Sequence, residues 1–181
     1  QAYCETCASV GMVFWNQRMT AMSGNAEYID VLERSLYNGA LDGLSLSGDR
    51  FFYGNPLASR GQHQRREWFG TACCPANIAR LIASLGDYIY AKSNDAIYVN
   101  LYVGSNTLIP LTTGDVGVKM ETNYPWEGAV ALQIDPVKSA TFTLKMRIPQ
   151  WAYTTFNSPG NLYKGSSNGF HAFSILLNGK E

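Results

Sequence analysis

The first half of the chain carries apolar residues at helical spacing, and the second half alternates apolar with polar residues. Over residues 6–22 the apolar positions recur three and four residues apart, which predicts one buried helix face. Gly24 is suited to end this helix, and Asn25 is suited to cap the next one. A third helix is predicted to start at Pro75, because an apolar stripe follows over residues 78–89. The first half is therefore predicted to be helical.

Residues 40–72 interrupt the helical pattern. They are rich in Gly, Ser and Arg and show no sustained period, so we expect a long loop with a short extended piece at 50–53. Loops of this length are uncommon in compact domains and tend to be functional.

From residue 96 onward the apolar positions alternate with a period of two, as in half-buried strands. The predicted strands cover residues 96–103, 116–122, 129–134, 141–148 and 173–177, with a loop over 154–172. Short strands separated by Gly- and Pro-containing turns are typical of an antiparallel sandwich or sheet. The prediction is an α+β chain with a helical part at 1–93 and a β part at 94–181.

Composition and charge narrow the class of protein. Charged residues make up 15% and hydrophobic residues 46%, a balance that excludes a disordered chain. Fourteen Lys and Arg residues offset fourteen Asp and Glu residues, which argues against a nucleic-acid partner. No apolar run approaches the ~20 residues of a membrane span, so we expect no membrane contact. Residues 1–20 lack a signal-peptide pattern. We therefore favour a cytoplasmic location, with the periplasm as the alternative.

The four cysteines form two tight pairs that lie 66 positions apart (from 7 to 73). They allow three disulfide pairings, but thiolates are also the ligands that select zinc. In an extended segment Glu5 and Cys7 would point to the same side, which favours Glu5 over Cys4 as a ligand. The candidate metal site is therefore Cys7, Cys73 and Cys74 with either Glu5 or Cys4.

Cys73 and Cys74 directly precede the predicted start of the third helix. A helix N-terminus carries partial positive charge and free N–H groups, which lower the pKa of a nearby thiol. A bound metal ion acts in the same direction. A thiolate here is a candidate nucleophile, and two small buried core residues are the alternative interpretation.

Two motifs carry a resemblance to a known family. The segments Glu5-Thr-Cys7-Ala-Ser and Cys73-Cys74-Pro-Ala-Asn77 resemble glycoside hydrolase family 127, which contains the β-L-arabinofuranosidases. The stretches 51–57, 68–74 and 124–128 are also similar, so the resemblance covers essentially the whole chain. It implies the last helices of an (α/α)6 barrel, followed by an antiparallel β-sandwich domain that is itself possibly incomplete in this chain.

The resemblance also implies specific roles for single residues. Zinc would be bound by Glu5, Cys7, Cys73 and Cys74, and Cys73 would be the nucleophile of a retaining glycosidase. Tyr53 would contact the sugar of a small-molecule or oligosaccharide substrate. Cys4 departs from the family pattern and is a competing ligand.

The general acid/base Glu of the family and its sugar-contacting histidines would lie before residue 1. We therefore expect the chain to need a missing N-terminal part of the same protein and to be inactive in isolation. Helices cut from a barrel would also expose apolar faces, and self-association is one way to cover them.

Other residues and functions compete with this interpretation. His63 could touch a substrate, although a solvated loop histidine is the simpler expectation. Glu67 is a weak candidate for the acid. A non-catalytic carbohydrate-binding β module with a structural zinc site is the main alternative function. A thiol redox protein using Cys4 and Cys7 would need a βαβ context that the sequence lacks.

Overall fold

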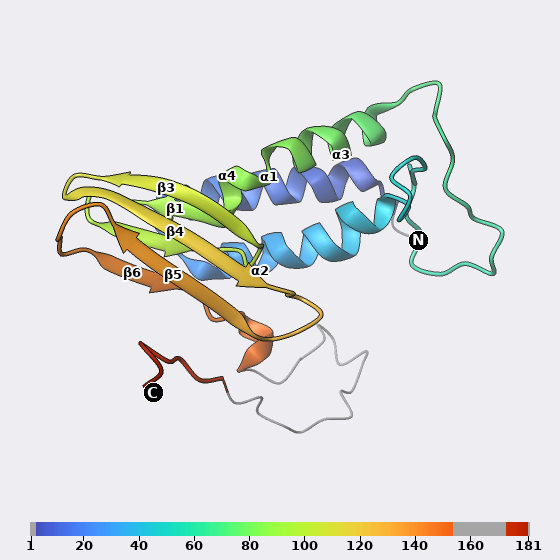
Figure 1. The fold of residues 1–181 in the computed structure, drawn as a ribbon. Helices are drawn as coiled ribbons and strands as arrows, with labels where there is room; N and C mark the ends of the chain where they lie inside the picture. Colours follow the sequence, from blue (N-terminus) through green and yellow to red (C-terminus); the bar gives the residue numbers. More distant parts are fainter. Residues whose placement is uncertain (1–2, 154–172, 181) are drawn as a thin grey trace. The chain divides into compact units, whose positions relative to one another are not determined.

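The computed structural model describes residues 3–153 and 173–180 of the 181-residue chain. The chain divides into two compact units, Gln1–Met146 and Arg147–Glu181. The first unit holds the principal helices and all of the named strands (Figure 1). Of the second unit, the described residues contain one short helix, η3 (Gln150–Ala152).

The helices lie where the apolar spacing predicts them. They are α1 (Thr6–Ser23), α2 (Ala26–Ser35), the π-helix η1 (Leu36–Ala40), the 3₁₀ helix η2 (Leu41–Gly43), α3 (Cys73–Ser84) and α4 (Gly86–Ile89). Gly24 ends α1 with a left-handed φ of 68°, a conformation that glycine adopts without strain. The Asn25 side chain accepts a hydrogen bond from the Glu27 N–H and so caps α2. The predicted α1–α2 boundary is confirmed.

Helix α1 packs against both α2 and α3 (Figure 1). Val10 and Val13 are fully buried in this contact. Trp15 and Met22 on the same helix are 64% and 83% exposed. The apolar spacing over 6–22 places Met22 on the buried face, and this expectation is wrong because Met22 lies exposed in the last turn of α1. Exposed large side chains on α1 agree with the expectation of uncovered helix faces.

The strands form two three-stranded sheets. One has the order β1 (Tyr90–Lys92), β2 (Ala96–Val99) and β6 (Thr143–Met146); the other has the order β3 (Ser105–Leu111), β4 (Gly114–Thr122) and β5 (Val130–Pro136). All pairs are antiparallel except β2 with β6, which run parallel. The predicted α+β class, with helices followed by sheets, is confirmed.

Several strand predictions need correction. Strands β1 and β3 were not predicted, because Pro110 and an exposed Leu108 hide the alternation of β3. The strand expected at 173–177 is absent; Leu177 forms only an isolated bridge with Lys180. The loop expected at 154–172 lies outside the described residues.

The first unit buries its apolar side chains in adjoining clusters. The helical cluster centres on Val13, Leu32 and Leu81, and residue Leu101 from the β part completes it. A hydrogen bond from the Tyr124 hydroxyl to the Glu33 carboxylate, 2.9 Å long, also ties the sheets to α2. Among the described residues no helix is both long and apolar enough to cross a membrane.

Candidate metal centre and active site

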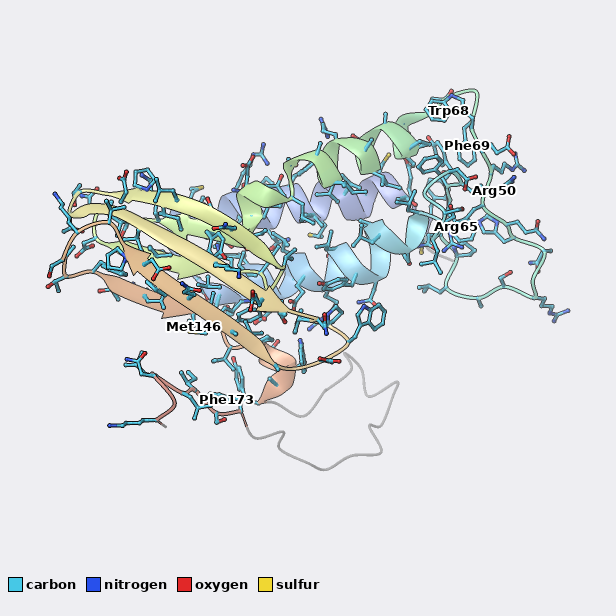
Figure 2. The ribbon with its side chains drawn as sticks, viewed as in Figure 1. Arg50, Arg65, Trp68, Phe69, Met146 and Phe173 are labelled. Atoms are coloured by element: carbon cyan, nitrogen blue, oxygen red, sulfur yellow. The ribbon has the colours of Figure 1, made fainter. Side chains whose placement is uncertain are left out.

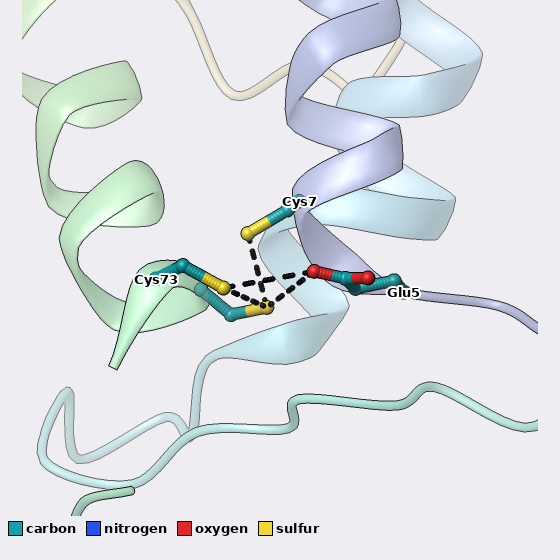
Figure 3. Close-up of side chains that lie close together, drawn as sticks. Glu5, Cys7 and Cys73 are labelled. Carbon is teal, nitrogen blue, oxygen red and sulfur yellow. Dashed lines mark hydrogen bonds between the residues drawn. The ribbon is translucent and has the colours of Figure 1, made fainter. Parts of the chain in front are cut away.

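Four side chains from two distant segments meet at the starts of α1 and α3. Glu5 occupies the N-cap of α1 and Cys7 lies in its first turn, while Cys73 and Cys74 open α3. Their ligand atoms all lie within 4.8 Å of one another (Figure 3). The structure therefore brings together all four residues of the ligand set that the family resemblance implies.

The loop between the helices fixes the start of α1. The Thr6 N–H donates to the Tyr53 carbonyl at 3.0 Å, and the Thr6 hydroxyl donates to the Phe52 carbonyl at 3.0 Å. Glu5 forms a β-bridge with Gly54. These bonds hold Tyr53 and the Glu5 carboxyl at the same end of the helix pair.

The structure corrects two expectations about the backbone at this site. The segment around Glu5 and Cys7 is not extended throughout, because the helix already begins at Thr6. Cys73 and Cys74 lie inside the first turn of α3, not before it. Pro75 is tolerated there because the first four N–H groups of a helix have no partner within the helix.

The spacing of the cluster fits a tetrahedral metal site. Cys7 Sγ lies 3.1 Å from Cys74 Sγ, and Glu5 Oε1 lies 3.6 Å from Cys73 Sγ and 3.8 Å from Cys74 Sγ. Zinc–sulfur bonds of about 2.3 Å separate the ligands of a tetrahedral site by about 3.8 Å. Three thiols and one carboxylate are also a donor set that zinc accepts.

The same geometry bears on the choice between Cys4 and Glu5 as a ligand. The cluster contains Glu5 and not Cys4. No disulfide links any of the four cysteines. The disulfide interpretation of the two cysteine pairs is therefore wrong, since Cys7 and Cys74 instead point to a common centre with Glu5.

Cys73 and Cys74 are neighbours in sequence but differ in their surroundings. Cys74 is fully buried, whereas Cys73 is half-buried and lies 3.1 Å from the Tyr53 hydroxyl. A hydrogen bond from Tyr53 favours the thiolate and lowers the pKa of Cys73. Burial raises the pKa of Cys74. In the metal-free protein Cys73 is thus the thiol more readily ionised.

The Cys73–Tyr53 contact acts on both partners. The hydrogen bond with Cys73 raises the pKa of Tyr53, so the phenol keeps its proton and remains a donor.

Burial raises the pKa of Cys7, and a hydrogen bond from Asn77 opposes that shift. The Asn77 amide donates to Cys7 Sγ at 3.1 Å. Asn77 is a site residue that the sequence did not assign to the metal centre; its one-turn spacing from Cys73 and Cys74 on α3 was the available signal.

Two residues weighed from the sequence lie outside the cluster. His63 stacks on Phe52 and places Nε2 2.7 Å from the Gly54 carbonyl oxygen. Glu67 forms an ion pair with Arg50 at 2.7 Å, and its side chain is 74% exposed. Both are exposed residues of the loop and neither belongs to the cluster, but His63 is among the residues that line a pocket beside it.

A pocket of about 450 Å³ opens on the loop beside the cluster. Its lining residues include three aromatic residues, two arginines and one histidine: Phe52, Tyr53, Phe69, Arg65, Arg66 and His63. Figure 2 shows Arg65 and Phe69 on this loop, near the start of α3. The volume lies within the ~300–1,000 Å³ range of small-molecule sites.

Comparison with known protein families assigns the chain. The model of the β-L-arabinofuranosidase GH127 catalytic domain matches residues 1–87, and that of the GH127 middle domain matches residues 96–181. The chain belongs to glycoside hydrolase family 127. The resemblance carried by the two cysteine motifs is therefore confirmed, while the division of the chain at residue 93 remains a prediction.

Individual GH127 proteins are similar over most of the chain. A curated non-reducing end β-L-arabinofuranosidase from Bifidobacterium longum subsp. longum is 38% identical over 83% of this chain and 25% of its own length. The crystal structure of a GH127 β-L-arabinofuranosidase from Geobacillus stearothermophilus T6 is 45% identical, with a TM-score of 0.79, over 84% of this chain and 26% of that one.

A further solved GH127 β-arabinofuranosidase is 48% identical, also with a TM-score of 0.79, over 83% of this chain and 24% of its own length. The chain therefore spans about a quarter of the length of these relatives. It is a part of a larger GH127 protein.

Proposed function

We propose that the larger protein is a retaining glycoside hydrolase that acts on β-L-arabinofuranosides and uses Cys73 as its nucleophile. The names of its GH127 relatives support the substrate class. The observation that carries the role of Cys73 is its asymmetry with Cys74. Of these adjacent thiols, only Cys73 is both half-buried and in hydrogen-bond contact with a tyrosine.

Zinc is the metal that best suits the cluster of Glu5, Cys7, Cys73 and Cys74. When bound, it would supply positive charge that keeps the cysteines ionised at neutral pH. Without such a charge, several anionic groups within 4.8 Å of one another repel strongly. The donor set and the spacing therefore support a metal site more than a cluster of core thiols.

In the proposed reaction the Cys73 thiolate attacks the anomeric carbon of the arabinofuranosyl unit. The sulfur–carbon bond forms while the bond to the leaving oxygen breaks, and a carboxylic acid gives that oxygen its proton. The family resemblance places this acid before residue 1. Water then attacks the same carbon, passes its proton to the carboxylate and returns Cys73 as a thiolate.

Tyr53 has two proposed roles in this sequence of steps. Its hydroxyl lies 3.1 Å from the Cys73 sulfur, and once Cys73 is ionised it would donate to the thiolate at the start of α3. Its ring lines the adjoining pocket, so the same side chain can contact the sugar. The first role agrees with the pKa shifts of the pair, because their hydrogen bond lowers the pKa of Cys73 and raises the pKa of Tyr53.

The test compares Cys73→Ser with Cys74→Ser in the full-length protein, using an aryl β-L-arabinofuranoside as substrate. Cys73→Ser should abolish turnover while the fold is retained. Cys74→Ser should mainly lower the zinc content, and added zinc should restore part of its turnover. Equal residual activity in both variants would contradict the assignment of Cys73.

Metal content is measured on the same preparations. Elemental analysis of wild-type protein should give one zinc per chain. A metal content near zero, with all four thiols titrating freely, would remove the proposed metal site. Stoichiometric zinc with no hydrolysis of any arabinofuranoside would instead favour a structural zinc site in a carbohydrate-binding protein.

A further inference from the structure

The pocket beside the cluster shares one side chain with it. Tyr53 lies 3.1 Å from Cys73 Sγ through its hydroxyl, and the same residue lines the pocket. A ligand in the pocket would thus contact the same tyrosine whose hydroxyl lies beside Cys73. The pocket is therefore placed to receive a second part of any substrate whose reacting sugar lies at Cys73.

The wall of the pocket is built by contacts within the loop. The Arg65 guanidinium lies 4.4 Å from the centre of the Phe52 ring, and His63 stacks on the same ring at 4.8 Å. Arg65 also donates to the Asp42 carbonyl at 2.6 Å. The backbone of Arg66 exchanges two hydrogen bonds with Phe51, of 2.7 and 2.9 Å. These contacts fix the positions of both arginines but use only one N–H of the Arg65 guanidinium and only the backbone of Arg66.

The charge of the pocket is one-sided. Arg65 and Arg66 both line it, and within the described part of the chain no Asp or Glu is among its lining residues. Glu67, the acidic residue next in sequence, instead pairs with Arg50. Asp42 contacts Arg65 through its backbone carbonyl, and its carboxylate accepts a hydrogen bond from Asn55. The arginine charges are therefore not neutralised by a carboxylate lining the pocket.

Arg65 also has a hydrogen-bond donor without a partner among the described residues. The Arg65 Nε atom is buried and has no hydrogen-bond partner within the described part of the chain. Buried polar atoms in proteins are nearly always satisfied, so this N–H can take a further hydrogen-bond acceptor; the buried Asp42 Oδ1 atom is likewise without a partner among the described residues. Arg66 is exposed, and its guanidinium presents a planar fork that matches a carboxylate.

We propose that this pocket binds a carboxylate-bearing unit, such as a uronic acid, attached to the arabinofuranosyl group that is cleaved. The proposal rests on the proposed function and sharpens it, because it makes the enzyme selective for acidic glycosides. Tyr53 and Phe69 would pack on the ring of that unit, and Arg66 would pair with its carboxylate.

The test uses the full-length enzyme and two synthetic substrates, para-carboxyphenyl β-L-arabinofuranoside and its neutral para-carbamoylphenyl counterpart. The measured quantity is the ratio of their kcat/KM values, which cancels effects common to both substrates. Arg66→Gln should lower this ratio about fivefold, the size expected for an ion pair that is open to solvent. Arg66→Lys keeps the positive charge and should retain most of the preference.

Arg60→Gln is the matched control, since Arg60 is an exposed arginine of the same loop that does not line the pocket. It should leave the ratio unchanged. In wild-type enzyme the ratio should also fall at about 1 M salt, where the Debye length is only ~3 Å. Hydrolysis of both substrates with the same ratio in wild type and Arg66→Gln would overturn the carboxylate pocket alone. Hydrolysis of neither substrate by wild type would overturn the proposed function together with it.

Discussion

The cluster of Glu5, Cys7, Cys73 and Cys74 and the β3–β4–β5 sheet are assembled in opposite ways. The thiol and carboxyl groups of the cluster meet across 67 to 69 positions of sequence. In the sheet, neighbouring strands follow one another along the chain, with Leu111 paired to Gly114 and Val116 to Pro136. The sheet buries valines such as Val118, whereas the cluster gathers ionisable groups.

The difference indicates which of the two regions depends for its stability on groups outside the described residues. Alternating apolar residues and short turns specify the sheet register and bury its own apolar surface. The cluster brings together groups that repel when they ionise, so under the proposed function it would be stabilised by a bound cation and by neighbours that orient the thiols. The sheet is therefore expected to be independent of metal, and the cluster is not.

The largest expected effect is loss of hydrolysis in the isolated chain while the sheet remains folded. The isolated 181-residue chain should not hydrolyse an aryl β-L-arabinofuranoside. The acid that protonates the leaving group contributes about 10²–10⁴-fold in rate, and the family resemblance implies that this acid lies before residue 1. Hydrogen exchange should still show protected amides in β3, β4 and β5. Parallel assays with the full-length enzyme give the comparison.

Turnover by the isolated chain within about tenfold of the full-length enzyme would contradict this prediction, because no proton donor would then be missing. Glu67 would become the first acid to replace, despite its surface pairing with Arg50.

The next effect concerns the stability of the sheet. Met120 in β4 is 2% exposed, so Met120→Ala should lower the free energy of unfolding by about 2–5 kcal/mol through lost burial and a residual cavity. Urea unfolding of the full-length protein measures it. Leu108→Ala in β3, where the side chain is 56% exposed, is the control and should cost much less.

Zinc affinity of a still-folded Met120→Ala protein should equal that of wild type. A large loss of zinc affinity in this variant would show that the sheet and the cluster are not independent.

A smaller effect is expected from Asn77, which touches the cluster without belonging to it. Asn77→Ala removes the hydrogen bond to Cys7 Sγ and should weaken zinc binding about 10–100-fold, as loss of a group that orients a metal ligand usually does. Competition with a chromogenic chelator measures the affinity. Asn123→Ala, which removes an exposed amide that bonds Glu127, should leave it unchanged.

If Asn77→Ala binds zinc as tightly as wild type, Cys7 is oriented by the backbone of α1 alone. Metal-free Asn77→Ala should unfold at a urea concentration close to that of metal-free wild type, because the effect acts through the metal.

The smallest effect belongs to the outer face of the sheet. Lys119 and Glu121 form an exposed ion pair of 2.6 Å on β4, a kind of contact that adds little to stability. Lys119→Gln should shift neither the urea midpoint nor the zinc affinity measurably. A clear loss of stability would mean that this face is covered in the full-length protein.

Local patterns predicted much of the fold. The apolar spacing gave the limits of α1 closely, and Gly24 and Asn25 marked the break before α2. They did not predict β3, because its alternation is obscured by Pro110, nor the parallel pairing of β2 with β6. Pairing between strands more than 40 positions apart leaves no mark in either strand's own pattern.

By itself the sequence determined the two cysteine motifs, their place at helix starts and the chemistry that soft ligands allow. Only the tertiary structure decided that Glu5 and not Cys4 joins the cluster, that Cys74 is buried while Cys73 faces Tyr53, and that two arginines share a pocket with that tyrosine. The physical reason is that periodicity is a property of one segment. Burial, pKa and ligand geometry depend on groups brought together across 67 to 69 positions of sequence, which no local pattern records.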